Sequence, residues 1–364
     1  MSEDPRISRT SGIDIPAESR ADLPSTSSPP ALSHRLFFGA DDLRASWSLL
    51  IFFVIISLLI LPTIPIFRHQ LAQQTPAPHT TAAHGPVERG VSATLTQDGL
   101  LFAVLLVSSF VMSRIERRPF ASYGIGATPQ ALRQLFTGLL WGVLFLSLLI
   151  LLLRSIHLLV FDARLLSAAA IPRFAAEWAL GFLFVSLFEE YFLRGFLLFT
   201  LARGLSGIYA AILKSPHTDA LGFWTAATLL AFVFGLGHRA NPGESSIGLL
   251  TAGVAALVFS LSLWRTGSLW WAIGFHAAWD WAQSFLYGVA DSGIMMRHHL
   301  FATHPVGTPL LSGGLTGPEG SVFVLPLLLA VAAVIWVTLP QTPRPSGPLL
   351  EAPSTLVTAA DNSL

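Results

Sequence analysis

The chain has 364 residues, of which 52% are hydrophobic and 12% are charged, and its mean hydropathy is +0.63. Soluble domains carry roughly 25% charged residues, so this chain has too few to cover a soluble globule of its size. It has no net charge and no cysteine, which excludes disulfides, iron–sulfur clusters and thiol nucleophiles and gives no indication of a nucleic-acid partner. The composition indicates a protein whose solvent is partly the lipid bilayer.

The first 40 residues are rich in Pro, Ser, Asp and Arg, and we expect them to form a disordered tail. Eight apolar segments follow, most of them close to the ~20 residues that a membrane-spanning helix needs. Their approximate ranges are 45–67, 97–113, 132–153, 174–200, 220–238, 246–263, 268–288 and 321–340. Polar loops lie at 68–91 and 291–320, and a second disordered tail is expected at 341–364.

This pattern predicts an all-α fold, a polytopic membrane helical bundle with about eight transmembrane helices. We divide it into three N-terminal membrane helices (45–153), a catalytic membrane core (174–288) and one last membrane helix (321–340). No internal repeat is evident in the sequence.

Three charges interrupt the apolar segment 174–200, in the sequence Phe188-Glu189-Glu190-Tyr191-Phe192-Leu193-Arg194-Gly195. Charged side chains at membrane depth are expensive and mark functional sites by default. Residues four apart lie on one helix face, so we expect Glu190 to pair with Arg194. Glu189 points elsewhere, and an unpaired carboxylate in a medium of low dielectric suits a general base. The alternative is a buried ion network that only holds helices together.

Two later segments each carry a histidine, in Phe234-Gly235-Leu236-Gly237-His238 and in His276-Ala277-Ala278-Trp279-Asp280. In both, the first and last residues share a helix face. The two glycines allow another helix or a substrate backbone to approach closely. The second pair has the groups to hold a water, a metal or an oxyanion, unless its aspartate only fixes the histidine tautomer. The structural alternative is that the first histidine is an interfacial or satisfied core residue and that the second pair makes a helix–helix hydrogen bond. Because carboxylates and imidazoles activate water, the three segments together predict a membrane-embedded hydrolase.

The order Glu-Glu-x-x-x-Arg, Phe-x-x-x-His and His-x-x-x-Asp on successive membrane helices resembles the CAAX-protease and bacteriocin-processing family. This intramembrane protease family includes the eukaryotic Ras-converting endopeptidase. The sequence Arg265-Thr266-Gly267-Ser268-Leu269-Trp270, which leads into the third motif, also looks like family sequence. The resemblance covers about residues 174–288, and the rest of the chain matches only as generic membrane helix.

The resemblance implies hydrolysis of a peptide bond within the membrane, in a membrane-associated peptide or protein. A prenylated CAAX-type protein is one substrate that the family suggests. Carried over residue by residue, Glu189 and His238 would activate the water, and Glu190 and Arg194 would orient that site. His276 and Asp280 would stabilise the oxyanion or complete the site. The third motif ends here in aspartate instead of the family's asparagine, which puts its oxyanion role in doubt, because an aspartate donates a hydrogen bond only when protonated.

Several alternatives stay open at the level of sequence. Zn²⁺ or another divalent metal, held by Glu189, His238 and His276, is one source of activated water, and a metal-free glutamate mechanism is the other. A non-catalytic protein of the same fold, such as a bacteriocin self-immunity or chaperone-like factor, is the main functional alternative. A transporter ranks lower, because transporters carry related motifs in both halves and the first half here has none. The expected location is the bacterial inner membrane, as a multi-pass protein.

One geometric conflict follows from the predicted spans. If full spans alternate in direction, Glu189 lies at mid-membrane while His238 lies at the far end of the next helix. Two groups that share one water must lie within a few ångströms of it. The helices must therefore tilt, break or have other boundaries, and Gly235 and Gly237 are the expected break points.

Overall fold

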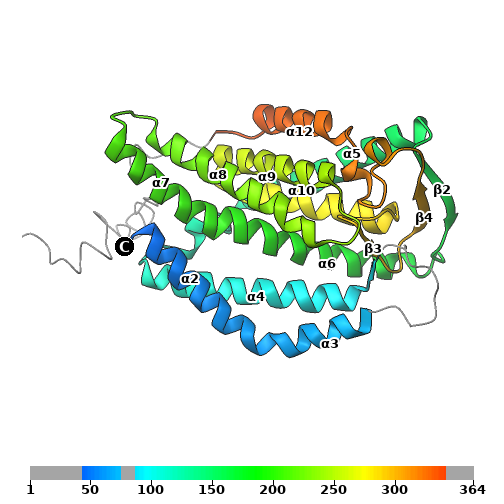
Figure 1. Cartoon of the computed structure of the whole chain (residues 1–364), viewed down its shortest axis with the longest axis horizontal. Coiled ribbons are helices and arrows are strands. Elements are labelled where there is room, and N and C mark those ends of the chain that lie inside the picture. The colour runs from blue at the N-terminus through cyan, green and yellow to red at the C-terminus, as the bar shows by residue number, and fades with distance from the viewer. Residues whose placement is uncertain (1–42, 75–86, 342–364) are drawn as a thin grey trace, which may run out of the picture.

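The computed structural model describes residues 43–74 and 87–341. The predicted tail at 1–40 and the C-terminal tail from residue 342 onward lie outside these ranges. The described part is predominantly helical (Figure 1). In chain order the helices are α2 (Ala45–Ile60), α3 (Ile64–Gln74), α4 (Val91–Ile115), α5 (Pro129–Ser155), α6 (Ile171–Glu190), α7 (Leu198–Ile212), α8 (Thr218–Gly237), α9 (Ser246–Thr266), α10 (Trp270–Trp281), α11 (Pro309–Ser312) and α12 (Val324–Thr338).

The all-α polytopic bundle is confirmed, with a difference in the number of full spans. Six stretches of the described residues are long and apolar enough to cross a membrane: Ala45–His69, Val91–Ile115, Pro129–Ser155, Ile171–Ile212, Thr218–Ala240 and Ser246–Thr266. The predicted span 268–288 is instead the short helix α10, continued by a π-helical segment at Ala282–Leu286. The predicted span 321–340 is α12, which is also short. Hydropathy detected both as apolar helices but overestimated the lengths of the two α-helices.

Helices α6 and α7 form one continuous helix that runs the length of the molecule (Figure 1). A π-helical segment, Tyr191–Leu197, joins them directly after Glu190. The whole stretch has 42 residues, which at 1.5 Å per residue gives a helix of ~63 Å, about twice the thickness of the hydrocarbon core. The predicted segment 174–200 was therefore too short. A helix of this length tilts strongly or projects beyond the bilayer.

This extension removes the conflict between Glu189 and His238. Helix α8 packs antiparallel against α7 after a short turn, and the two residues lie at similar distances along the chain from that turn. Helix α8 runs through Gly235 and ends at Gly237, where the 3₁₀ turn His238–Ala240 begins. Of the two expected break points, only Gly235 was wrong. A Cβ at Gly235 would meet the carbonyl oxygen of Leu249 on α9, whereas one at Gly237 would meet nothing within 4 Å. The predicted close approach of a neighbouring helix is confirmed at Gly235 alone.

Helix α10 is held by unusually close packing against α5. Gly138 and Gly142 of α5 face the α10 backbone, and Gly274 of α10 faces the α5 backbone, so that a Cβ at any of the three would overlap a carbonyl oxygen. Small residues of this kind let membrane helices approach without a gap. Helix α10 also packs against α6, so the α5 contact fixes the height at which His276 faces the Glu189-Glu190 pair.

Four short strands lie at one end of the bundle (Figure 1). Strand β1 (Val87–Arg89) pairs in parallel with β3 (Ile294–Met296), and β2 (Leu159–Arg164) pairs antiparallel with β4 (Phe301–Pro305). Both β3 and β4 belong to residues 287–323, which we call the 287–323 segment. The sequence predicted a polar loop over most of it. Its pairing with strands distant in sequence folds it back over the end of the helices.

The α5–α10 packing gives a direct test. Gly142→Ala is expected to lower the free energy of unfolding by about 1–3 kcal/mol, because the new Cβ forces the two backbones apart. Gly207→Ala on α7 is the matched control, since an added Cβ there meets nothing within 4 Å, and we expect it to change stability by less than about 1 kcal/mol. Thermal unfolding in detergent, followed by tryptophan fluorescence, measures both. Equal midpoints for the two variants would contradict this packing.

Candidate active site

A cavity of about 210 Å³ opens between α6, α8, α9 and α10 and is closed on one side by the 287–323 segment. Of the six residues predicted from the motifs, four line it: Glu189, His238, His276 and Asp280. The other two, Glu190 and Arg194, do not line the cavity but connect to it through His276. The structure therefore brings the three motifs together at one place.

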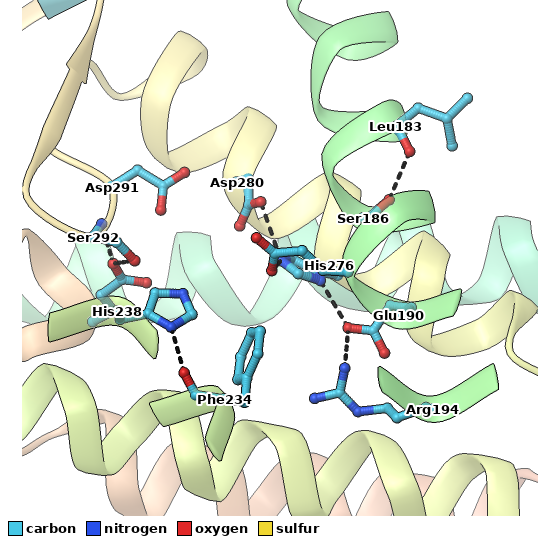
Figure 2. Close-up of polar contacts among 12 residues, drawn as sticks. Leu183, Ser186, Glu190, Arg194, Phe234, His238, His276, Asp280, Asp291 and Ser292 are labelled. Carbon is cyan, nitrogen blue, oxygen red and sulfur yellow. Dashed lines mark hydrogen bonds and ion pairs between the residues drawn. The ribbon is translucent and has the colours of Figure 1, made fainter. Parts of the chain in front are cut away.

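The predicted pair between Glu190 and Arg194 is confirmed. Nη1 of Arg194 lies 2.7 Å from Oε1 of Glu190, and both side chains are buried. The same carboxylate oxygen lies 2.9 Å from Nδ1 of His276 (Figure 2). An unpaired buried carboxylate would be very costly, and these two partners offset that cost.

Aromatic rings and one carbonyl complete the surroundings of Arg194. Its guanidinium lies 5.1 Å from the ring centroid of Phe234 and 5.5 Å from that of Phe259. Its Nε donates to the carbonyl oxygen of Ala256 at 3.3 Å. Cation–π contacts are strong where water is excluded. Phe234 of the second motif therefore packs over Arg194 of the first motif and stabilises its charge.

His276 has a carboxylate at each ring nitrogen. Nδ1 faces Glu190, and Nε2 lies 3.3 Å from Oδ2 of Asp280 and 3.8 Å from Oε2 of Glu189. A neutral imidazole donates from one nitrogen only, so this arrangement suits the protonated ring, which donates from both. Asp280 acts here as an acceptor for the histidine, which was one of the two alternatives left open by the sequence.

Glu189 has a different environment from its neighbour Glu190. Its side chain is 27% exposed, its nearest ion-pair partner is His276 at 3.8 Å, and it faces the cavity. This contrast follows from the helix itself, because adjacent residues point about 100° apart. The Glu190 carboxylate is paired with buried side chains, whereas the Glu189 carboxylate stays accessible to a ligand or a water.

The tautomer of His238 is fixed by its own helix. Nδ1 lies 2.8 Å from the carbonyl oxygen of Phe234 (Figure 2), and since a carbonyl only accepts, Nδ1 carries the proton. In the neutral ring, Nε2 then has a free lone pair. The Phe234 ring packs edge-on against the imidazole at 4.6 Å between centroids and restricts its rotation. His238 is thus built to accept a proton or a hydrogen bond from the cavity.

The sequence analysis missed two acidic residues of the cavity, Asp291 and Glu319, which come from the 287–323 segment. Burial raises the pKa of Asp291 well above its usual range, and the carboxylates of Asp280 and Glu319 raise it further. Burial, followed by Glu244 and Asp280, raises the pKa of Glu319 to about 7. Only their position beside apolar spans could have pointed to them, because no motif contains them.

The residues proposed as metal ligands do not fit that role. Both ring nitrogens of His276 face carboxylates, so no lone pair is left for a metal. Within residues 43–74 and 87–341, no three or more His, Asp and Glu side chains are grouped as a metal site requires. A metal site at Glu189, His238 and His276 therefore has no support from the donor arrangement.

A buried charge cluster beside an accessible carboxylate and imidazole, inside a bundle of membrane-length helices, defines an integral membrane protein with a hydrolase-like site. Residues 171–282 match the sequence model of the family described as type II CAAX prenyl endopeptidase Rce1-like. No curated protein and no solved structure matches the chain. The matched region begins at the first residue of α6, ends just beyond α10 and contains all three motifs. This match confirms the resemblance to the CAAX-protease family and supports a protease.

The raised pKa of Glu319 predicts how stability depends on pH. Its value in the folded protein, about 7, exceeds the ordinary 4.5, so the folded state binds the proton more tightly than the unfolded state. This contribution is fully present below about pH 4.5 and is lost as the pH rises towards 7. Glu319→Gln should therefore raise the free energy of unfolding at pH 8 relative to wild type, by on the order of 2 kcal/mol. The loss of stability between pH 5 and pH 8 should be smaller in this variant than in the wild type.

Thermal midpoints in detergent at pH 5 and pH 8 measure this effect. Glutamine keeps the oxygen that accepts from the hydroxyl of Ser292 at 2.9 Å, so the variant changes charge more than contacts. Glu88→Gln, which removes an exposed carboxylate, controls for the lost charge. If the thermal midpoint of Glu319→Gln falls between pH 5 and pH 8 as much as that of the wild type, another group causes the fall.

Proposed function

We propose that the protein is an intramembrane endopeptidase that hydrolyses a peptide bond with a water activated by Glu189 and His238. The observation that carries this proposal is the division between paired and free groups. Glu190 is paired with Arg194 and His276 in buried contacts, while the Glu189 carboxylate and His238 line one cavity. A carboxylate oxygen and an imidazole lone pair are two acceptors, which is what a water with two hydrogens needs.

In the proposed reaction, the water oxygen attacks the peptide carbonyl carbon while Glu189 takes one of its protons. His238 accepts a hydrogen bond from the other hydrogen through Nε2. The carbonyl electron pair moves to oxygen and gives a tetrahedral oxyanion. When this collapses, the C–N bond breaks and Glu189 returns its proton to the leaving nitrogen. The products are a carboxylic acid and an amine, and the enzyme groups regain their starting states.

The proposed substrate is a membrane-associated protein with a prenylated CAAX-type C-terminus. The family description names prenyl endopeptidases, and the cavity offers apolar as well as acidic walls. The apolar lining includes Phe182, Val185, Phe259, Ala255 and Leu328, which suits aliphatic side chains on either side of a cleaved bond. The proposed location is the bacterial inner membrane.

The proposal predicts loss of cleavage when either water-activating group is removed. Glu189→Gln should lower kcat by about 10²–10⁴, because it removes a general base at nearly constant shape, and His238→Ala should also abolish most activity. The measurement is cleavage of an internally quenched, farnesylated CAAX peptide by detergent-purified protein. Glu177→Gln is the matched control, since it neutralises a carboxylate on the same helix, outside the cavity lining.

Two other results would change the interpretation. Equal cleavage by wild type, Glu189→Gln and His238→Ala, all folded, would place the activity in a contaminant. A separate arm with a chelator tests metal removal, and we expect cleavage to persist. Loss of activity that added Zn²⁺ restores would instead mean that a metal supplies the activated water.

A further inference from the structure

An oxyanion formed during peptide hydrolysis needs hydrogen-bond donors that are already in place. In the family pattern, this role belongs to the last residue of the third motif. In this chain that residue is Asp280, and it accepts from Nε2 of His276. The other nitrogen of His276 is bound to Glu190. Neither residue of the third motif therefore offers a free N–H to the cavity.

Few neutral side chains around the cavity have a donor to spare. The hydroxyl of Thr251 donates to backbone oxygens, and that of Ser292 donates to Glu319. Two neutral N–H groups belong to cavity-lining residues that make no side-chain hydrogen bond within residues 43–74 and 87–341: the amide of Asn241 and the indole of Trp279. The chain has only one other asparagine, Asn362.

The position of Asn241 is coupled to His238. Residues His238–Ala240 form one turn of 3₁₀ helix at the end of α8, and the backbone N–H of Asn241 donates to the carbonyl oxygen of His238 at 2.9 Å. Asn241 itself is extended, with φ −76° and ψ 131°, as the residue before a proline prefers, and Pro242 follows it. The turn and the proline fix the backbone of Asn241 relative to His238, the residue that accepts from the water in the proposed reaction.

We propose that the side-chain amide of Asn241 donates a hydrogen bond to the oxyanion of the tetrahedral intermediate. This inference rests on the proposed function and adds a catalytic residue that none of the three motifs contains. As the water oxygen bonds to the carbonyl carbon, its proton passes to Glu189 and the carbonyl π pair moves to oxygen. The Asn241 amide stabilises that negative charge without transferring a proton, so the balance of the reaction is unchanged.

The test uses the full-length protein and the farnesylated CAAX peptide. Asn241→Ala should lower kcat by about 10²–10³ and change KM by less than about 3-fold, because the donor acts on the transition state more than on the bound substrate. Asn241→Ser, which keeps a shorter neutral donor, should recover part of the loss. Asn362→Ala is the matched control and should cleave at the wild-type rate.

A second variant gives a signature that a purely structural role would not produce. In Asn241→Asp the group repels the oxyanion when ionised and donates to it when protonated. The activity of this variant relative to wild type should therefore rise as the pH falls from 8 to 5. If Asn241→Ala does not fold, the pH dependence of the activity of Asn241→Asp relative to wild type tests the proposal by itself.

The outcomes separate the inference from the function on which it rests. If wild type cleaves the peptide while Asn241→Ala keeps its kcat within 3-fold, or the Asn241→Asp ratio is independent of pH, the inference is overturned and the function stands. If Trp279→Phe loses more kcat than Asn241→Ala, the indole is the donor and the inference is again overturned. If wild type does not cleave, the proposed function fails and the inference falls with it.

Discussion

The buried carboxylate of Glu190 is the constraint on which the site depends. One of its oxygens lies within hydrogen-bonding distance of Arg194 on its own helix and His276 on α10. In a medium of low dielectric, removing either partner leaves an uncompensated charge, which is far more costly than the pair is favourable. Helix α10 therefore has one acceptable height and rotation against α6. The close α5–α10 backbone contact at Gly142 and Gly274 stabilises the same arrangement from the other side.

Much of the local geometry could be predicted from the sequence, because spacing of four residues fixes a helix face. That rule gave the Glu190–Arg194 pair, the shared face of Phe234 and His238, and the contact of His276 with Asp280. Family resemblance added the expectation that the three motifs converge. Helix boundaries were harder: the predicted segment 174–200 already included the π-helical stretch Tyr191–Leu197, but hydropathy did not show that the helix continues past residue 200 to Ile212. The missed extension to Ile212 created the apparent conflict between Glu189 and His238.

The rest of the site depends on contacts between residues distant in sequence. No local pattern indicates that Glu190 also binds His276, or that the Phe234 ring covers Arg194. Asp291 and Glu319 reach the cavity only because β3 pairs with β1 and the 287–323 segment folds back over the helix ends. A polar segment between two apolar helices looks the same in sequence whether it is a solvated loop or one wall of a cavity.

The departure of the third motif from the family pattern has a structural consequence for charge. An asparagine at position 280 would donate to one side and accept on the other, whereas Asp280 only accepts, and it is held by His276. The cavity is lined by four carboxylates and by the imidazoles of His238 and His276; the carboxylates belong to Glu189, Asp280, Asp291 and Glu319. Burial first, and then the neighbouring carboxylates, raise the pKa values of Asp291 and Glu319. In the proposed reaction, the negatively charged intermediate needs a hydrogen-bond donor close to the attacking water, and Asn241, in the turn after His238, is the donor that we propose.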